Sequence, residues 1–577
     1  MNFKRYLPIL QWLSTYDRAF LKNDLVAGLT VWVMLVPQGM AYALLAGLPP
    51  IYGLYGALIP LFLYAILGTS RHLSIGPVAI SSLLILAGIS QIAEPYSADY
   101  ISYAILAGLL IGIFQAAASL IRLGVLVNFL SHPVIAGFTS AAVIIIGVNQ
   151  LKYLMGINIP RFSNLMDTAW YAIRHIGETH LPTFLLCIGG IALILIFKKI
   201  NKALPGALSA TILGILIVKF MNLDQQGVDI VKDIPRGLPI FQLPAITLEN
   251  IKLVMPTVLT VTIIGIIESI SIAKVWEVKN KDYKIDANQE LLAIGFSKIG
   301  GAFFQALPTS GSFTRSAVNS ETGAKTQLSS IIAAGLIALT LIFLTPLFYY
   351  LPNAILAAII LASIIGLFDV QEAIYLWKTH KSDFTMMILT FLITLILGIE
   401  EGVLAGVIFS VLMVLYRSTK PHVAILGQLP NTQFYRNISR FPNAIQLSDC
   451  TIVRFDSQLF FINSNYFKEV IEELIQSPEQ IPKVLILDAS SIHDVDSSGL
   501  KALEDIIDFL KEHDVQFYIS GIIGPVRDLF YKAKLTDKIG KENQFMHVKD
   551  AVDCYCSRQA RQVDNWTDSV LQTNVRK

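Results

Sequence analysis

The first long apolar run of the chain carries polar and helix-breaking residues inside a stretch long enough to cross a bilayer. Residues 28–60 read GLTVWVMLVPQGMAYALLAGLPPIYGLYGALIP, with Pro37, Gln38 and several glycines where a simple anchor helix would carry leucine. Such a backbone is tolerated at membrane depth only where it packs against protein or lines a cavity. The run therefore predicts a helix that contacts a solute rather than a passive membrane anchor.

The composition excludes an ordinary soluble protein. Of the 577 residues, 54% are hydrophobic and only 15% are charged, whereas about a quarter of the residues in a typical soluble domain are charged. The net charge of +2 gives no support for nucleic-acid binding, and four scattered cysteines favour neither a disulfide framework nor a metal site. Because the sequence also lacks the common catalytic motifs, we expect neither an enzyme nor a cofactor or metal.

We expect a membrane all-α domain over residues 24–420, because apolar segments continue to about residue 417. The third and tenth segments are short, and each follows a stretch rich in glycine, serine, threonine and proline. They hold matching places in a seven-plus-seven arrangement, and paired interruptions of this kind are typical of the binding site of an inverted-repeat transporter. The fourteen expected segments are 24–47, 51–68, 77–91, 101–121, 125–148, 182–197, 205–221, 254–275, 288–304, 313–320, 327–349, 353–368, 383–399 and 402–417.

Basic residues indicate the orientation of these segments. Lysine and arginine residues follow the even-numbered segments, as Lys198 and Lys199 do after the sixth and Arg417 does after the last. Basic residues are enriched in cytoplasmic loops, so the N-terminus and the C-terminal part are both predicted to be cytoplasmic. Residues 1–23 are expected to form a segment at the membrane surface, and the protein is expected in the inner or plasma membrane.

After residue 420 the pattern becomes that of a soluble α/β domain. We expect a linker over 421–448 and a small domain over 449–556, whose strands read TIVRF, LFFIN, KVLILD and VQFYIS with helices between them. The polar tail over 557–577 is expected to be disordered.

The tenth segment contains the strongest candidate for a binding site. The stretch SGSFTRSAV places Arg315 among small residues at membrane depth, where a charge is costly and marks a functional site by default. If Ser312 to Arg315 open a short helix, its free N–H groups attract an anion, and GPVAISS in the third segment can do the same. The alternative is a structural helix break in which Arg315 pairs with a carboxylate. Two breaks at matching places favour the binding site.

Four more positions are candidates, and each has two interpretations. Glu268 lies in the middle of the eighth segment, where it either carries a proton or forms a permanent salt bridge with Arg315. Gln38 and Tyr42 lie four residues apart on one helix face, so they either line a pocket or pack against another helix. Ser498, in the stretch DVDSSGL, is either a helix cap or a phosphorylation site.

Together these stretches resemble the SulP family, the solute-carrier 26 type of anion transporter. The resemblance covers residues 18–555, and its motifs are VPQGMAYALLAGLPPIYGLYGALIP at 36–60, GTSRHLSIGPVAISS at 68–82 and a long match at 268–329. The DSSGL loop resembles that of the STAS domain found in this family. The resemblance implies core and gate domains with an elevator-like motion, a homodimer, and a cytoplasmic STAS domain open to a regulatory partner.

The resemblance also implies a function and a set of site residues. The function is secondary transport of a small inorganic anion. The leading substrate is sulfate, carried together with protons, and bicarbonate, chloride and dicarboxylates are the alternatives. A membrane-anchored signalling protein with a STAS output is the alternative from another class. Glu268 matches the acidic position linked to proton coupling, and Val78 stands where other members carry an aromatic residue, which implies a more open site. The anion-binding positions carry over to Gln38, Tyr42, Val78, Ser312, Phe313, Thr314 and Arg315.

Overall fold

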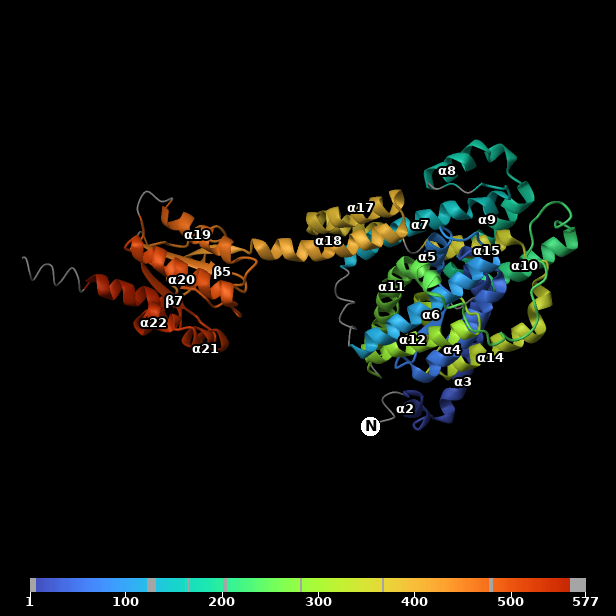
Figure 1. The fold of residues 1–577 in the computed structure, drawn as a ribbon, viewed down its shortest axis with the longest axis horizontal. Coiled ribbons are helices and arrows are strands. Elements are labelled where there is room, and N and C mark those ends of the chain that lie inside the picture. The colour runs from blue at the N-terminus through green and yellow to red at the C-terminus, as the bar shows by residue number, and fades with distance from the viewer. Residues whose placement is uncertain are drawn as a thin grey trace, which may run out of the picture. The chain divides into compact units, whose positions relative to one another are not determined.

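The chain divides into a helical unit and a unit built around a β-sheet (Figure 1). The computed structural model describes residues 7–121, 131–160, 162, 165–200, 205–280, 283–365, 368–447, 449–476 and 481–560. The first unit is Met1–Ser410 and the second is Val411–Lys577. The division falls inside helix α18 (Ile399–Thr419).

The helices of the first unit follow the predicted apolar segments in order, and each of the fourteen segments overlaps one of them. The start of the segment at 125–148 lies outside the described residues. Besides α18, the elements are α2 (Ile9–Leu13), α3 (Arg18–Leu45), α4 (Pro50–Leu67), β1 (Ser74–Gly76), α5 (Ala79–Ile89), α6 (Ala98–Leu120), α7 (His132–Met155), α8 (Leu165–Arg174), α9 (Leu181–Ile200), α10 (Gly206–Met221), α11 (Leu248–Asn280), α12 (Ala287–Phe303), β2 (Ser310–Ser312), α13 (Phe313–Glu321), α14 (Leu328–Leu339), α15 (Asn353–Ile364), α16 (Val370–Thr379) and α17 (Lys381–Ile396).

Within the described residues, eight helices are long and apolar enough to cross a membrane. Shorter apolar helices such as α5 and α15 account for several of the other predicted segments, so fourteen crossings remain a prediction. Helices α8 and α16 are not among the predicted segments. Both are amphipathic, and their exposed apolar side chains include Trp170 and Trp377.

Helix α3 differs from its expected form at two places. It begins at Arg18 rather than at residue 24, because the Asp17 side chain accepts the Ala19 N–H at 2.9 Å and caps the helix start. It also continues through Pro37 to Leu45 without a break. A proline removes one helical N–H donor, and packing of the buried surroundings tolerates this loss at membrane depth.

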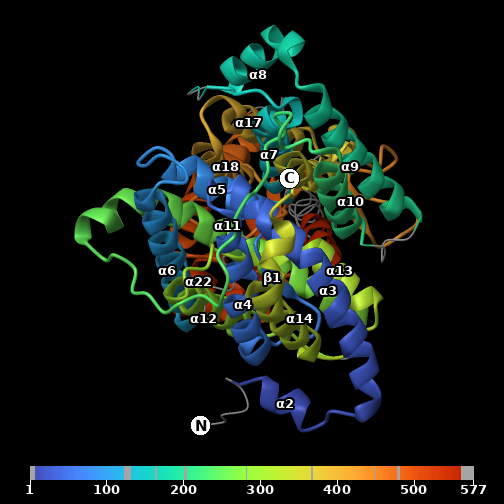
Figure 2. The ribbon, with the colours of Figure 1, turned by 90° about the vertical axis from the view of Figure 1, so that its right-hand side faces the viewer.

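The helices of the first unit form two groups. One group consists of α3–α6 and α11–α14, with contacts between α6 and α12, α3 and α14, and α5 and α11. The other consists of α7, α9, α10, α15 and α17, with contacts between α7 and α17 and between α9 and α15, and the start of α18 packs on α17 where Gly402 meets Thr394. Contacts of α3 with α10 and α15 join the two groups. The strand β1 lies inside the first group, against α4 and α13 (Figure 2).

Two glycines allow α3 and α4 to approach each other closely. A Cβ atom added to Gly53 would overlap the carbonyl oxygen of Gly39, and one added to Gly39 would lie 3.2 Å from the carbonyl oxygen of Gly53. The obstacle is backbone, so no side chain can turn away to make room. This contact holds α3, which carries Gln38 and Tyr42, against its neighbour.

We expect Gly53→Ala to force α3 away from α4 and to destabilise the first unit by about 1–3 kcal/mol, as overpacking does. The measurement is the thermal melting of the full-length protein in detergent. Gly147→Ala is the matched control, because a Cβ atom at this glycine of α7 would meet nothing within 4 Å. Equal melting of the two variants would contradict a structural role for the glycine contact.

The second unit is an α/β domain around one sheet with strand order β4-β3-β5-β6-β7-β8. Strands β5 to β8 run parallel, while β3 is antiparallel to β4 and β5. One face packs on α19–α22, and the other is covered by a C-terminal helix over 548–560. The elements are β3 (Val423–Gln428), β4 (Tyr435–Asn437), β5 (Cys450–Phe455), α19 (Ser464–Gln476), β6 (Val484–Asp488), α20 (Ser497–Glu512), β7 (Gln516–Ser520), α21 (Gly524–Lys532), α22 (Leu535–Ile539) and β8 (Gln544–Phe545).

Two expectations for this unit are wrong. Residues 421–448 are not a simple linker, because they contain β3 and β4, and β3 pairs antiparallel with β5. The stretch LFFIN forms no strand: Leu459 makes a single bridge to Val495, and the following residues turn into α19. The strands expected at TIVRF, KVLILD and VQFYIS are present as β5, β6 and β7. Most of the tail expected over 557–577 lies outside the described residues.

Candidate functional site

A short antiparallel ladder joins the third and tenth predicted segments. Strand β1 pairs with β2 so that Ser74 lies opposite Ser312 and Gly76 lies opposite Ser310. Helix α5 follows β1 and helix α13 follows β2, so the two helices begin from opposite ends of the same ladder. The ladder supplies partners for backbone groups that would otherwise be unsatisfied at membrane depth.

Buried side chains fix the loop that leads into β1. Glu290 of α12 is fully buried and accepts hydrogen bonds from the Tyr64 hydroxyl at 2.7 Å, the Thr69 N–H at 2.6 Å and the Ser70 N–H at 3.0 Å. Gln327 donates to the Ser70 carbonyl at 2.7 Å. The loop is therefore held from α4, α12 and the start of α14, and this fixes where α5 begins.

Arg315 crosses the space between the two helix starts. It is fully buried, and its Nη1 atom donates to the Pro77 carbonyl at 3.0 Å and to Gln38 Oε1 at 3.4 Å. A Cβ atom at Gly76 would lie 3.0 Å from Nη2, so the glycine leaves room for the guanidinium. Within the described residues, Nε and Nη2 of Arg315 have no hydrogen-bond partner. Buried unpaired donors are costly, so this group is suited to an acceptor ligand.

Glu268 does not form a direct ion pair with Arg315 in the described part of the chain. Its Oε2 atom accepts the Ser310 hydroxyl at 2.9 Å. The adjacent Ser269 hydroxyl accepts the Gly311 N–H at 3.0 Å. These bonds attach α11 to β2 and place the carboxyl group beside the ladder. The alternative of a permanent Glu268–Arg315 salt bridge is therefore not the arrangement present.

The remaining predicted positions differ in exposure. Gln38 and Tyr42 of α3 are buried, and Val78 is the buried N-cap residue of α5. Ser312 is the N-cap residue of α13 and accepts the Arg315 N–H at 3.3 Å. The exposed residues are Thr314 and Phe313, whose ring lies 5.8 Å from that of Trp276. Thus Gln38, Val78 and Arg315 come together at the helix starts.

Among the described residues, sequence reasoning missed several buried charged side chains, and Lys298 is the lysine among them. Lys298 lies in the ninth predicted segment and is only 3% exposed, with its ammonium 2.8 Å from Gln115 Oε1. The sequence feature that identified Arg315 applies to Lys298 as well. A lysine inside an apolar membrane segment is costly and marks a candidate functional residue.

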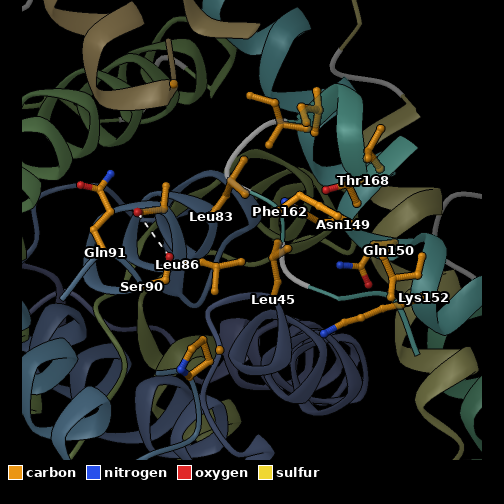
Figure 3. Close-up of a pocket in the computed structure, with 18 of the residues that line it drawn as sticks. Leu45, Leu83, Leu86, Ser90, Gln91, Asn149, Gln150, Lys152, Phe162 and Thr168 are labelled. Atoms are coloured by element: carbon orange, nitrogen blue, oxygen red, sulfur yellow. Dashed lines mark hydrogen bonds between the residues drawn. The ribbon is translucent and has the colours of Figure 1, made fainter. Parts of the chain in front are cut away.

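A cavity of about 770 Å³ lies at the other end of α5 (Figure 3). Leu83 and Leu86 of α5, with Ser90 just after its end, face Gln150 and Lys152 of α7 across it (Figure 3). None of the predicted anion-site residues is among the described residues that line it. This cavity lies between residues of the two helix groups and is distinct from the space around Arg315.

Ser498 lies in the second unit, at the start of α20, and it is not the helix cap. The cap is Asp496, whose carboxylate accepts the Gly499 N–H at 2.8 Å and the Phe461 N–H at 2.9 Å. Aspartate at this position satisfies the free N–H groups at least as well as serine. The capping interpretation of Ser498 is therefore wrong, and its regulatory role stays a prediction.

These features define a class: a helical protein of the membrane type in which two short helices start from a shared strand ladder, followed by a small α/β domain. The chain belongs to the sulfate permease family, whose family model matches residues 21–390, and the STAS domain model matches residues 441–551. These matches confirm the resemblance noted in the sequence.

Known relatives cover nearly the whole chain. The probable sulfate transporter 4.2 of Arabidopsis thaliana is 40% identical over 563 residues, which cover 94% of this chain and 83% of the relative. The chloroplastic sulfate transporter 4.1 of the same plant is also 40% identical, covering 94% and 82%. Among solved structures, the murine solute carrier 26 family member A9 anion transporter in the inward-facing state superposes with a TM-score of 0.87 at 25% identity, covering 95% and 93%.

Proposed function

We propose that this protein is a secondary transporter of a small inorganic anion, with sulfate as the leading substrate. The observation that carries the proposal is the buried Arg315 guanidinium, whose Nε and Nη2 atoms have no hydrogen-bond partner among the described residues and lie beside the starts of two half-helices. Helix starts and a guanidinium both favour negative charge, and the planar fork matches an oxyanion. Relatives named as sulfate transporters support this choice over bicarbonate, chloride or dicarboxylates.

An elevator-like motion is the proposed mechanism. The ladder and the proposed ligands Gln38, Tyr42, Val78 and Arg315 all belong to the first helix group. A site carried by one group can move as a rigid body along the other group without losing its ligands. The cavity between α5 and α7 lies at the junction of the two groups, where such a motion would change the packing.

We further propose that Glu268 carries a proton with the anion. Its carboxyl group is held beside β2 through Ser310 and makes no direct ion pair with Arg315 among the described residues. A carboxyl in low dielectric can take up a proton when an anion enters nearby. This would lower the net charge that crosses the membrane.

We further propose that the protein is a homodimer in the inner or plasma membrane, with the N-terminus and the STAS domain on the cytoplasmic side. The basic residues after even-numbered segments support this orientation. The STAS domain would then set rate or bind a cytoplasmic regulator, because every proposed ligand lies in the first unit.

Phosphorylation of Ser498 is the proposed control point. We expect Asp496→Ala to cost about 1 kcal/mol of domain stability through loss of the cap, and Ser498→Ala to cost little. Thermal melting of the full-length variants tests this.

A transport experiment tests the regulatory role. Uptake in the native cells is compared for wild type, Ser498→Ala and Ser498→Asp, and uptake equal to wild type in both variants under all growth conditions would exclude Ser498 from regulation.

The deciding experiment is uptake by purified protein in liposomes, with labelled sulfate, bicarbonate, chloride and succinate each tested under an inward proton gradient. We expect sulfate to enter, and to enter faster as the outside becomes more acidic. Uptake of another anion alone would correct the substrate. No uptake of any of the four would favour the rival function, in which the membrane part is a sensor and the STAS domain a signalling output.

A further inference from the structure

A second buried cation lies in the first helix group, and the proposed anion site does not use it. Lys298 of α12 is 3% exposed, and its ammonium donates to Gln115 Oε1 of α6 at 2.8 Å. Gln115 is fully buried as well, and its Nε2 atom donates to the Thr262 carbonyl of α11 at 3.4 Å. Burying a lysine against a neutral amide is costly, so this position needs a reason beyond packing.

The Lys298–Gln115 pair lies against the part of α11 that carries Glu268. A Cβ atom at Gly265, one turn before Glu268, would lie 3.4 Å from Lys298 Nζ and 3.9 Å from Ser310 Oγ. The Ser310 hydroxyl is the group that donates to Glu268. Lys298 therefore adds positive potential at the ladder without contacting the space around Arg315.

The charges around the ladder can be counted. The Arg315 guanidinium and a Lys298 ammonium supply two positive charges near the ladder, and an ionised Glu268 supplies one negative charge. In the described part of this helix group, Asp24 and Glu290 are fully buried carboxyl groups; neutral donors satisfy their hydrogen bonds and leave their charge unchanged. For Arg315, Lys298 and Glu268 alone, a divalent anion that enters with one proton on Glu268 brings the sum of the charges to zero. A monovalent anion with the same proton leaves one positive charge unbalanced.

We propose that Lys298 sets the preference of this transporter for a divalent over a monovalent anion, an inference that rests on the proposed function. Coulomb energy scales with the charge of the ligand, so a cation at fixed distance stabilises a divalent anion twice as strongly as a monovalent one. Lys298 acts through its potential rather than by contact, since its ammonium lies at Gln115 and beside Gly265 of α11 and not at the helix starts. Arg315 holds the anion, and Lys298 decides which charge is favoured.

The test compares two tetrahedral oxyanions of similar shape and different charge. Selenate is divalent and perchlorate is monovalent, and each competes with labelled sulfate for the purified full-length protein. In Lys298→Gln, we expect the preference for selenate over perchlorate to fall at least about tenfold relative to wild type. Lys298→Arg keeps the charge and should keep most of the preference. An unchanged preference in Lys298→Gln would overturn the inference.

A second variant separates charge from shape. Gln115→Glu leaves Lys298 in place but pairs its ammonium with a new carboxylate, and this cancels the same charge. We expect it to lower the preference in the same direction, and it decides the matter if Lys298→Gln fails to fold. If Lys298→Arg loses the preference as fully as Lys298→Gln, or Gln115→Glu retains it, side-chain fit and not charge is responsible. Wild-type protein that binds no sulfate would instead overturn the proposed function itself.

Discussion

Replacing Arg315 by alanine should weaken sulfate binding at least about a hundredfold, the largest single effect that we expect. The change removes the only guanidinium among the described residues at the helix starts, together with its bonds to Pro77 and Gln38. The N–H groups at the starts of α5 and α13 remain, so residual binding should persist. Equilibrium binding of labelled sulfate to purified protein measures the loss.

Two further variants show whether a loss of binding in Arg315→Ala is specific to the guanidinium at this position. Arg315→Lys keeps a charge but loses the planar fork, so it should bind with intermediate affinity. Arg174→Ala removes an arginine from the same unit, where it stacks 5.0 Å from the ring centre of Trp170 on α8, and should bind like wild type. Wild-type affinity in Arg315→Ala would mean that the guanidinium only supports the structure.

Glu268→Gln should abolish uptake driven by a proton gradient while leaving sulfate binding intact. The amide resembles the protonated carboxyl group, and its oxygen can still accept the Ser310 hydroxyl, so the ladder keeps its contact with α11. Uptake in liposomes should fall at least about tenfold at an acidic outside pH. Exchange of internal for external sulfate, which needs no net proton movement, should continue.

The same substitution elsewhere on α11 is the control for this effect. Glu277 forms an exposed pair with Lys274 at 2.7 Å, so Glu277→Gln should retain proton-driven uptake. Wild-type uptake in Glu268→Gln would remove this residue from coupling. Loss of binding together with uptake would make it a structural residue.

Hydropathy and local motifs predicted much of the fold because they depend on neighbouring residues. The apolar segments became helices, and the small-residue stretches before Val78 and Phe313 contain β1 and β2 and lead into the starts of α5 and α13. The capped start of α20 could also have been predicted from the sequence, since Asp496 in DVDSSGL is as good a cap as the serines that follow it.

Contacts between residues far apart in the chain could not be predicted from the sequence. Arg315 meets the Pro77 carbonyl across 238 positions, and Lys298 meets Gln115 across 183, so no local pattern records either contact. The β1–β2 ladder is three residues on each side, too short for period-two alternation to mark it. β3 was missed because its position in the sheet depends on pairing with β5, which no local pattern of its own residues reveals.

The central claim is that an anion binds between the starts of α5 and α13, and the most direct test is to locate one. Selenate carries a selenium atom whose anomalous scattering identifies it in crystals of the full-length protein. We predict a selenium peak beside Arg315, placed so that selenate oxygen atoms lie within hydrogen-bond distance of Nε and Nη2, the two buried donor atoms that have no partner among the described residues. A peak only in the cavity between α5 and α7, beside Lys152, with none at Arg315, would contradict the claim.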